Sequence, residues 1–138
     1  GAFCWGAGWV ARAAAAAALN GPKDDVRRCW AAFEERRNLI ADRIAQIDGL
    51  TLDPPGGAFY GLICCADLIG AETEDGDTLR DDAEVTAYIL KDAGIAAVPG
   101  SAYELSPFFR ISTAASMDVL GQAMDRIATS VAKLKRKT

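Results

Sequence analysis

Apolar and polar positions recur along this chain first at helical spacing and then with the shorter period of strands. After an irregular lead-in, an alanine-rich run up to Leu19 predicts a buried helix, which the stop signal Asn20-Gly21-Pro22 ends. Asp24 and Asp25 then supply the charge that favours the start of a long helix. Its apolar positions are Val26, Cys29, Trp30, Phe33, Ile40, Ile44 and Ile47. We therefore expect one face of this helix to be buried along its length.

Arg37 interrupts that face, because it lies on the same side as Phe33 and Ile40. A charge among apolar neighbours needs an acidic partner or a contact outside this chain. A paired, structural arginine is the interpretation that we favour.

The rest of the chain alternates short strands with helices. Strands are predicted over residues 50–52, 58–64, 95–98 and 108–113, with a sharp turn at 54–57. One helix begins with the capping pair Asp81 and Glu84 and ends at Gly94, and another begins at Ser116 or Asp118. This order predicts an α+β fold: a two-layer small domain with a small mixed or antiparallel sheet covered by helices.

The length of 138 residues and the 51% hydrophobic composition suit one compact core. The chain is therefore one domain or one piece of a larger protein. Its apolar start without an initiator Met indicates that something normally precedes Gly1. The alanine-rich start resembles neither a signal peptide nor a membrane span, because it lacks an initial basic region and carries Arg12.

The net charge of −4 and the absence of a broad basic surface argue against nucleic acid as a partner. Four basic residues near the C-terminus follow the last predicted helix, whose dipole they complement as a solvated tail. They are Lys133, Lys135, Arg136 and Lys137.

Residue types also exclude several chemistries. The chain has no His, which removes His-assisted nucleophiles and His metal ligands. Its four Cys residues show neither metal spacing nor a disulfide framework, so we expect a reducing cytoplasm.

The acidic segment 67–84 contains Glu74-Asp75-Gly76-Asp77, but its Gly comes too early for an EF-hand and no Glu closes it. We expect a solvated loop there.

Arg110 is the candidate binding residue, since it stands within the apolar run Phe108-Phe109-Arg110-Ile111-Ser112. Alternation along a strand places it on the side of Phe108 and Ser112, away from Phe109 and Ile111. A guanidinium on a rigid strand can hold a carboxylate or phosphate with two parallel hydrogen bonds. The alternative is a structural arginine paired with a local Asp or Glu, or one that extends to solvent from an edge strand.

Several segments together resemble the C-terminal part of class I pyridoxal-phosphate-dependent aminotransferases, the aspartate aminotransferase family, and bacterial members in particular. The resemblance covers nearly the whole chain from Leu19 onward. The matching segments are 18–22, 35–38, Pro55-Gly56-Gly57-Ala58-Phe59-Tyr60, 64–70, 94–103 with Val98-Pro99-Gly100-Ser101-Ala102-Tyr103, 105–112, 115–116 and the helix around 126–127.

The resemblance implies a function for Arg110, because the family's arginine at this place binds the α-carboxylate of the substrate. It further implies a homodimer that transaminates aspartate or another dicarboxylic amino acid with 2-oxoglutarate, using pyridoxal 5'-phosphate. Residues 1–138 would be the small C-terminal domain, and residues 1–22 the remnant of the connection to a missing large domain.

Two features depart from the family. Tyr103-Glu104 stands where members commonly have Phe-Gly, which puts a negative side chain on the loop that leads to the site. The lysine that holds the cofactor lies upstream in the family, and Lys23, Lys91 and the tail lysines lack the desolvated or electropositive setting that it needs. The chain alone should be inactive.

Two alternatives stay open. One is a free-standing, non-catalytic α+β module that binds a carboxylate or a partner, and the other is a neighbouring class I activity on aromatic amino acids or other oxo acids. A severed domain should expose apolar residues along the first helix and around Phe59 and Tyr60, whereas a true module should cover them.

Overall fold

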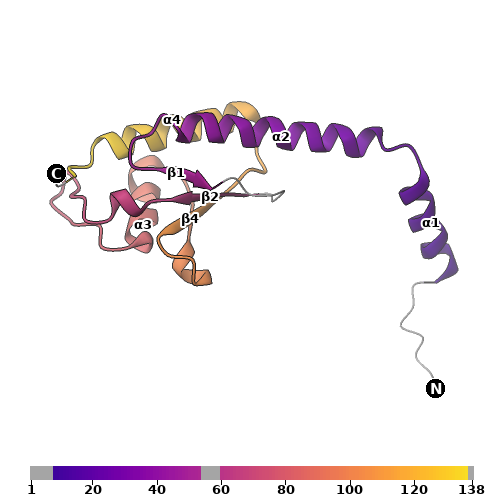
Figure 1. Cartoon of the computed structure of the whole chain (residues 1–138), viewed down its shortest axis with the longest axis horizontal. Coiled ribbons are helices and arrows are strands. Elements are labelled where there is room, and N and C mark those ends of the chain that lie inside the picture. Colours follow the sequence, from indigo (N-terminus) through magenta and orange to yellow (C-terminus); the bar gives the residue numbers. More distant parts are fainter. Residues whose placement is uncertain (1–7, 54–59, 137–138) are drawn as a thin grey trace, which may run out of the picture. The chain divides into compact units, whose positions relative to one another are not determined.

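The computed structural model describes residues 8–53 and 60–136, which form four helices, four strands and two short 3-10 helices (Figure 1). The helices are α1 (Trp9–Asn20), α2 (Asp24–Ile44), α3 (Asp82–Ala93) and α4 (Met117–Ala132). The strands are β1 (Thr51–Asp53), β2 (Tyr60–Cys64), β3 (Val98–Pro99) and β4 (Phe108–Ser112), and the 3-10 helices are η1 (Ala66–Leu68) and η2 (Gly100–Tyr103). The predicted turn at 54–57, with Ala58 and Phe59, lies outside the described residues.

The chain divides into two compact units, Gly1–Ala32 and Phe33–Thr138. The first holds α1 and the start of α2. Alanine favours the helical conformation of α1, but none of its residues is buried. Trp9 is 80% exposed, and Trp30 of α2 is 62% exposed. The expectation of a buried first helix and of a stripe buried along all of α2 is therefore wrong, whereas the exposure expected of a severed domain is confirmed for α1.

The second unit is built on an antiparallel sheet in the order β1-β2-β4-β3. In the register, Leu62 of β2 and Val98 of β3 both lie opposite Arg110 of the inner strand β4. The predicted α+β fold with a small antiparallel sheet is confirmed. Strand β3 is shorter than predicted, because residues 95–97 approach it without pairing.

One hydrophobic core joins the sheet to the helices. Figure 1 shows α4 and the end of α2 along one side of β1 and β2. The core consists chiefly of Ile40 and Ile44 from α2, Ile63, Phe109 and Ile111 from the sheet, Val85 and Ile89 from α3, and Leu120, Met124 and Ile127 from α4. Phe109 is fully buried while its neighbours Phe108 and Arg110 are half-buried, so the second face of β4 points away from this core.

The helix ends follow the predicted signals closely. Asp81 accepts a hydrogen bond of 2.8 Å from the backbone N–H of Glu84, and α3 ends at Gly94, whose φ is 69°. The Glu84 carboxylate accepts from the backbone N–H of Arg80, at 2.7 Å, instead of completing the capping box with Asp81. Ser116, and not Asp118, caps α4.

The acidic segment is more ordered than a solvated loop. Leu79 and Thr73 are buried, and Glu72 pairs through its backbone with Lys135, at 2.9 Å in both directions. This pairing ties the C-terminal tail to the domain. Lys133 and Arg136 form ion pairs with Asp92 and Asp48, so the expectation of a freely solvated tail is wrong for them.

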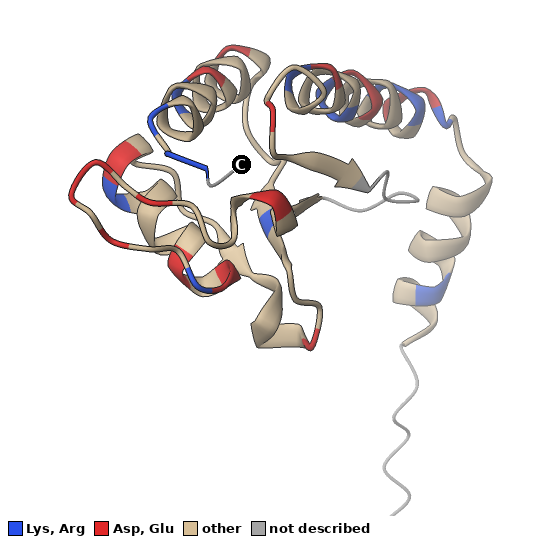
Figure 2. Cartoon of the chain, turned by 60° about the vertical axis from the view of Figure 1, so that its left-hand side comes forward, with Lys and Arg blue, Asp and Glu red and all other residues tan. Residues whose placement is uncertain are grey.

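Charges elsewhere on the surface are mixed. Figure 2 shows basic and acidic residues interspersed along α2. The Arg37 guanidinium lies 3.5 Å from the carboxylate of Glu34, one turn earlier, which confirms the paired arginine predicted for this helix. Within residues 8–53 and 60–136, no helix has the length and the apolar composition needed to cross a membrane.

Candidate functional site

Arg110 lies at the middle of β4, on the face of the sheet away from the core. Phe109 and Ile111 on either side of it point into the core, as strand alternation predicts. Because β4 is an inner strand, hydrogen-bonded to β2 and β3, the backbone that carries Arg110 is held on both sides. The alternative of an edge-strand arginine is therefore wrong.

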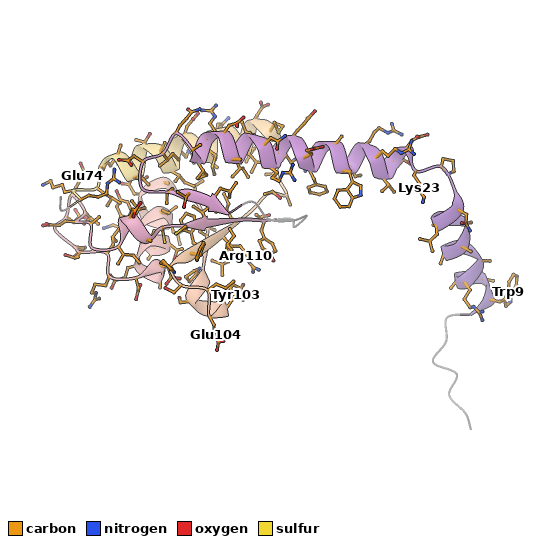
Figure 3. The ribbon with its side chains drawn as sticks, viewed as in Figure 1. Trp9, Lys23, Glu74, Tyr103, Glu104 and Arg110 are labelled. Atoms are coloured by element: carbon orange, nitrogen blue, oxygen red, sulfur yellow. The ribbon has the colours of Figure 1, made fainter. Side chains whose placement is uncertain are left out.

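Two tyrosines hold the Arg110 side chain. Its Cζ atom lies 4.5 Å from the ring centroid of Tyr103 and 4.9 Å from that of Tyr60. Both distances fit cation–π contacts. Nη2 of Arg110 also donates a hydrogen bond to the hydroxyl of Tyr103. Figure 3 shows the labelled Tyr103 and Arg110 close to each other.

Arg110 has no acidic partner among the residues that the structure describes. Its hydrogen bond to Tyr103 and its two ring contacts are the interactions found there. Glu104, although adjacent to Tyr103, points away from Arg110 in Figure 3. The side chains that the structure describes thus provide no local Asp or Glu as a structural pair for Arg110.

The segment between β3 and β4 places Tyr103, and it needs glycine at its start. A Cβ atom on Gly100 would lie 2.2 Å from the carbonyl oxygen of Leu105 and 2.6 Å from that of Phe108. The close approach lets the N–H of Leu105 donate to the Gly100 carbonyl at 2.9 Å. Only a residue without a side chain fits this turn.

Asp82 anchors the same segment from α3. Its carboxylate is fully buried and accepts a hydrogen bond of 2.7 Å from the backbone N–H of Ser101, while its Oδ1 atom has no hydrogen-bond partner among the described groups. No sequence pattern predicts this contact, since an aspartate in the first turn of a helix ordinarily complements the helix dipole.

Glu104 follows η2 with φ of 61°, in the left-handed region that glycine adopts most readily. This conformation gives a physical reason for the glycine that the resembling family commonly carries here. Glu104 and Tyr103 therefore differ in what they do: Glu104 occupies a strained backbone position, and Tyr103 contacts Arg110.

Cys65, which follows β2, is buried. Its Sγ donates to the carbonyl oxygen of Pro107 at 3.3 Å. Burial, with added repulsion from Asp82 and Cys64, raises the pKa of the Cys65 thiol to about 12. A thiol that resists ionisation is a poor nucleophile, so Cys65 is a packing residue.

The described lysines do not fit the cofactor site that the resemblance implies, because a lysine that reacts with a carbonyl must lose its proton. The hydrogen bond from Lys91 to Asp75 raises the pKa of Lys91, and that from Lys133 to Asp92 raises the pKa of Lys133. Lys23 and Lys135 are exposed, and Lys137 lies outside the described residues. None of the described lysines therefore has the setting that a cofactor-binding lysine needs.

Comparison with known proteins identifies the family of this chain. The profile of the family described as "Aminotransferase class I and II" matches residues 4–127. An aspartate aminotransferase of Rhizobium meliloti strain 1021 is 44% identical over 125 residues, which are 91% of this chain and 30% of the relative. An aspartate/prephenate aminotransferase of Cereibacter sphaeroides is 36% identical over 125 residues, or 91% of this chain and 31% of the relative.

Solved structures show the same fold. A crystal structure of the aspartate aminotransferase from Rhizobium meliloti superimposes with a TM-score of 0.85 at 43% identity, covering 91% of this chain and 32% of that one. An aromatic aminotransferase from Pyrococcus horikoshii matches with a TM-score of 0.71 at 28% identity, over 86% and 30% of the two chains. The chain thus spans about 30% of the length of the curated relatives cited here. It belongs to the family of class I and II aminotransferases.

Proposed function

We propose that this chain is the small C-terminal domain of a pyridoxal-phosphate-dependent aminotransferase that transfers the amino group of aspartate, or of another dicarboxylic amino acid, to 2-oxoglutarate. Membership of the aminotransferase family supports the reaction class. The names of two relatives that are 44% and 42% identical to this chain, both aspartate aminotransferases, support the substrate class. The cofactor and the lysine that holds it belong to the large domain before this chain, which is why the isolated chain is inactive.

Arg110 is the residue of this chain that binds the substrate, through its α-carboxylate. The single observation that carries this assignment is a guanidinium fixed on an inner strand, between two aromatic rings and without an acidic partner in the described regions. Its remaining N–H groups can hold two carboxylate oxygens. The amino-acid substrate and the oxo-acid product share that carboxylate, so one fixed clamp orients both halves of the reaction.

The exposed apolar side chains of α1 and early α2 support the proposed domain organisation. A free-standing module would cover them, whereas a domain made to pack against a larger partner leaves them exposed when the partner is absent. Residues 1–22 form the connection to that large domain, and the complete protein is a cytoplasmic homodimer with its sites near the subunit boundary. The small domain moves over the bound substrate and excludes water.

The test uses the complete protein with its cofactor, in which Arg110 is replaced by Lys and by Ala. Both variants should lower kcat/KM for aspartate by at least about 100-fold, since a bidentate ionic contact is lost or reduced, with little change in melting temperature. Arg43→Ala is the matched control, because it removes a surface arginine paired with Asp125 at 2.7 Å. Unchanged efficiency of Arg110→Ala would remove Arg110 from the site, and a large fall in melting temperature would favour a structural role.

A further inference from the structure

The hydroxyl of Tyr103 has an unused hydrogen beside Arg110. An arginine can only donate hydrogen bonds, so in the bond between them the tyrosine oxygen is the acceptor. The hydroxyl hydrogen has no acceptor among the groups that the structure describes. We propose that Tyr103 belongs to the substrate site: it positions the guanidinium and donates its own hydrogen to the carboxylate that Arg110 binds. This inference rests on the proposed function of Arg110.

The chemistry of the three groups is compatible. Tyr103 uses one N–H of Arg110, and the guanidinium keeps its other donors for a ligand. A carboxylate has about four lone-pair sites and can accept from the arginine and the hydroxyl together. Donation from a cation polarises the hydroxyl, which strengthens it as a donor to an anion. Since the Tyr103 side chain is 46% exposed, a ligand can reach it.

Three contacts hold Tyr103 in this place. Its own ring packs on the guanidinium at 4.5 Å. The turn at Gly100 and the Ser101 hydrogen bond to buried Asp82 fix the backbone just before it. A hydroxyl on such a constrained segment loses little further freedom when a ligand binds, so its hydrogen bond contributes more of its strength to affinity.

Tyr60 shows why the hydroxyl matters and not merely the ring. Its ring lies on the same guanidinium at 4.9 Å, but its hydroxyl has no hydrogen bond in the described structure. The two tyrosines therefore share the cation–π contact, and only Tyr103 adds a polar group next to the charge. Tyr103 is a substrate-binding residue, and it is also a positioning residue for Arg110.

The experiment measures the dissociation constant of succinate, a dicarboxylate without an amino group, for the complete protein with its cofactor. Tyr103→Phe keeps the ring and removes the hydroxyl, and it should weaken binding about tenfold, the usual effect of a hydrogen bond to a charged group. Tyr88→Phe is the matched control. It removes a hydroxyl that donates to the Ser130 carbonyl at 2.8 Å and so joins α3 to α4. This variant should leave the dissociation constant of succinate unchanged.

A double-mutant cycle separates this role from a structural one. With Arg110→Ala already present, adding Tyr103→Phe should change succinate binding less than about twofold, because the shared ligand contact is gone. If Arg110→Ala leaves binding intact, the proposed function itself fails. If Arg110→Ala weakens binding while Tyr103→Phe leaves it equal or tighter, the inference about Tyr103 is overturned and the function of Arg110 stands. An equal loss from Tyr103→Phe in both backgrounds would also overturn it.

Discussion

The buried carboxylate of Asp82 accepts a hydrogen bond of 2.7 Å from the backbone N–H of Ser101, and this contact joins the first turn of α3 to the segment that carries Tyr103. The position of Tyr103 thus depends on α3, a helix that carries neither Arg110 nor Tyr103. Asp82 is fully buried, so water does not readily replace its carboxylate as the acceptor.

Asp82→Ala should lower the free energy of unfolding by about 1–3 kcal/mol, since it removes the buried acceptor of the Ser101 N–H. Asp82→Asn keeps an acceptor oxygen and should cost clearly less. Chemical denaturation of the complete protein, or hydrogen exchange at the Ser101 amide, measures the difference. Equal stability of the two variants would show that the hydrogen bond does not stabilise this segment.

Gly100→Ala should destabilise this domain more than most substitutions that add a single methyl group. The added Cβ would lie 2.2 Å from a backbone oxygen, and backbone atoms cannot move aside as a flexible side chain can. We expect a loss of about 3 kcal/mol together with weaker substrate binding, as the segment shifts. Gly121→Ala in α4 is the control, because nothing lies within 4 Å of its Cβ position, and it should stabilise by about 0.5–1 kcal/mol. A harmless Gly100→Ala in thermal unfolding would contradict the described turn.

Glu104→Gly should stabilise the protein by about 1 kcal/mol, because the left-handed backbone at φ of 61° costs an L-residue about that much. Glu104→Ala removes the charge but keeps the backbone strain, so it should change stability little. Neither variant should alter the affinity for a carboxylate, since Glu104 points away from Arg110. A tighter dissociation constant in both variants would instead show that the charge reaches the site.

Thiol reactivity offers a test of burial. With a pKa of about 12, Cys65 stays protonated at pH 8, and it lies inside the core. Cys29 is exposed in this chain. Alkylation by iodoacetamide, followed peptide by peptide with mass spectrometry, should modify Cys29 quickly and Cys65 only on unfolding. Comparable rates would contradict the core described here, and protection of Cys29 in the complete protein would support a large domain that covers α2.

Much of this architecture could be predicted from local patterns. Asp81 and Gly94 mark the ends of α3 through their own backbone chemistry. The alternation around Arg110 predicts which side chains of β4 enter the core. Within that strand, Phe109 and Ile111 are the residues buried in it. Such features depend on neighbours a few residues away, which is the range that sequence patterns report.

The remaining features depend on partners that periodicity does not identify. The stripe that continues from Ile40 back to Trp30 predicts burial, but Trp30 is 62% exposed in the structure, and the pattern alone does not identify the surface that would cover it. The contact between Asp82 and Ser101 joins residues 19 positions apart, and the one between Cys65 and Pro107 spans 42. Tyr103 was visible as a departure from the family, yet its hydrogen bond to Arg110 required the three-dimensional structure.

The most direct test of the central claim is a crystal structure of the complete protein with its cofactor and a bound substrate analogue, such as a dicarboxylic amino acid with a blocked α-carbon. The account predicts two carboxylate oxygens within about 3 Å of the guanidinium nitrogens of Arg110. An analogue whose carboxylates are both bound by other residues, with Arg110 still held by Tyr103 and Tyr60 alone, would contradict it.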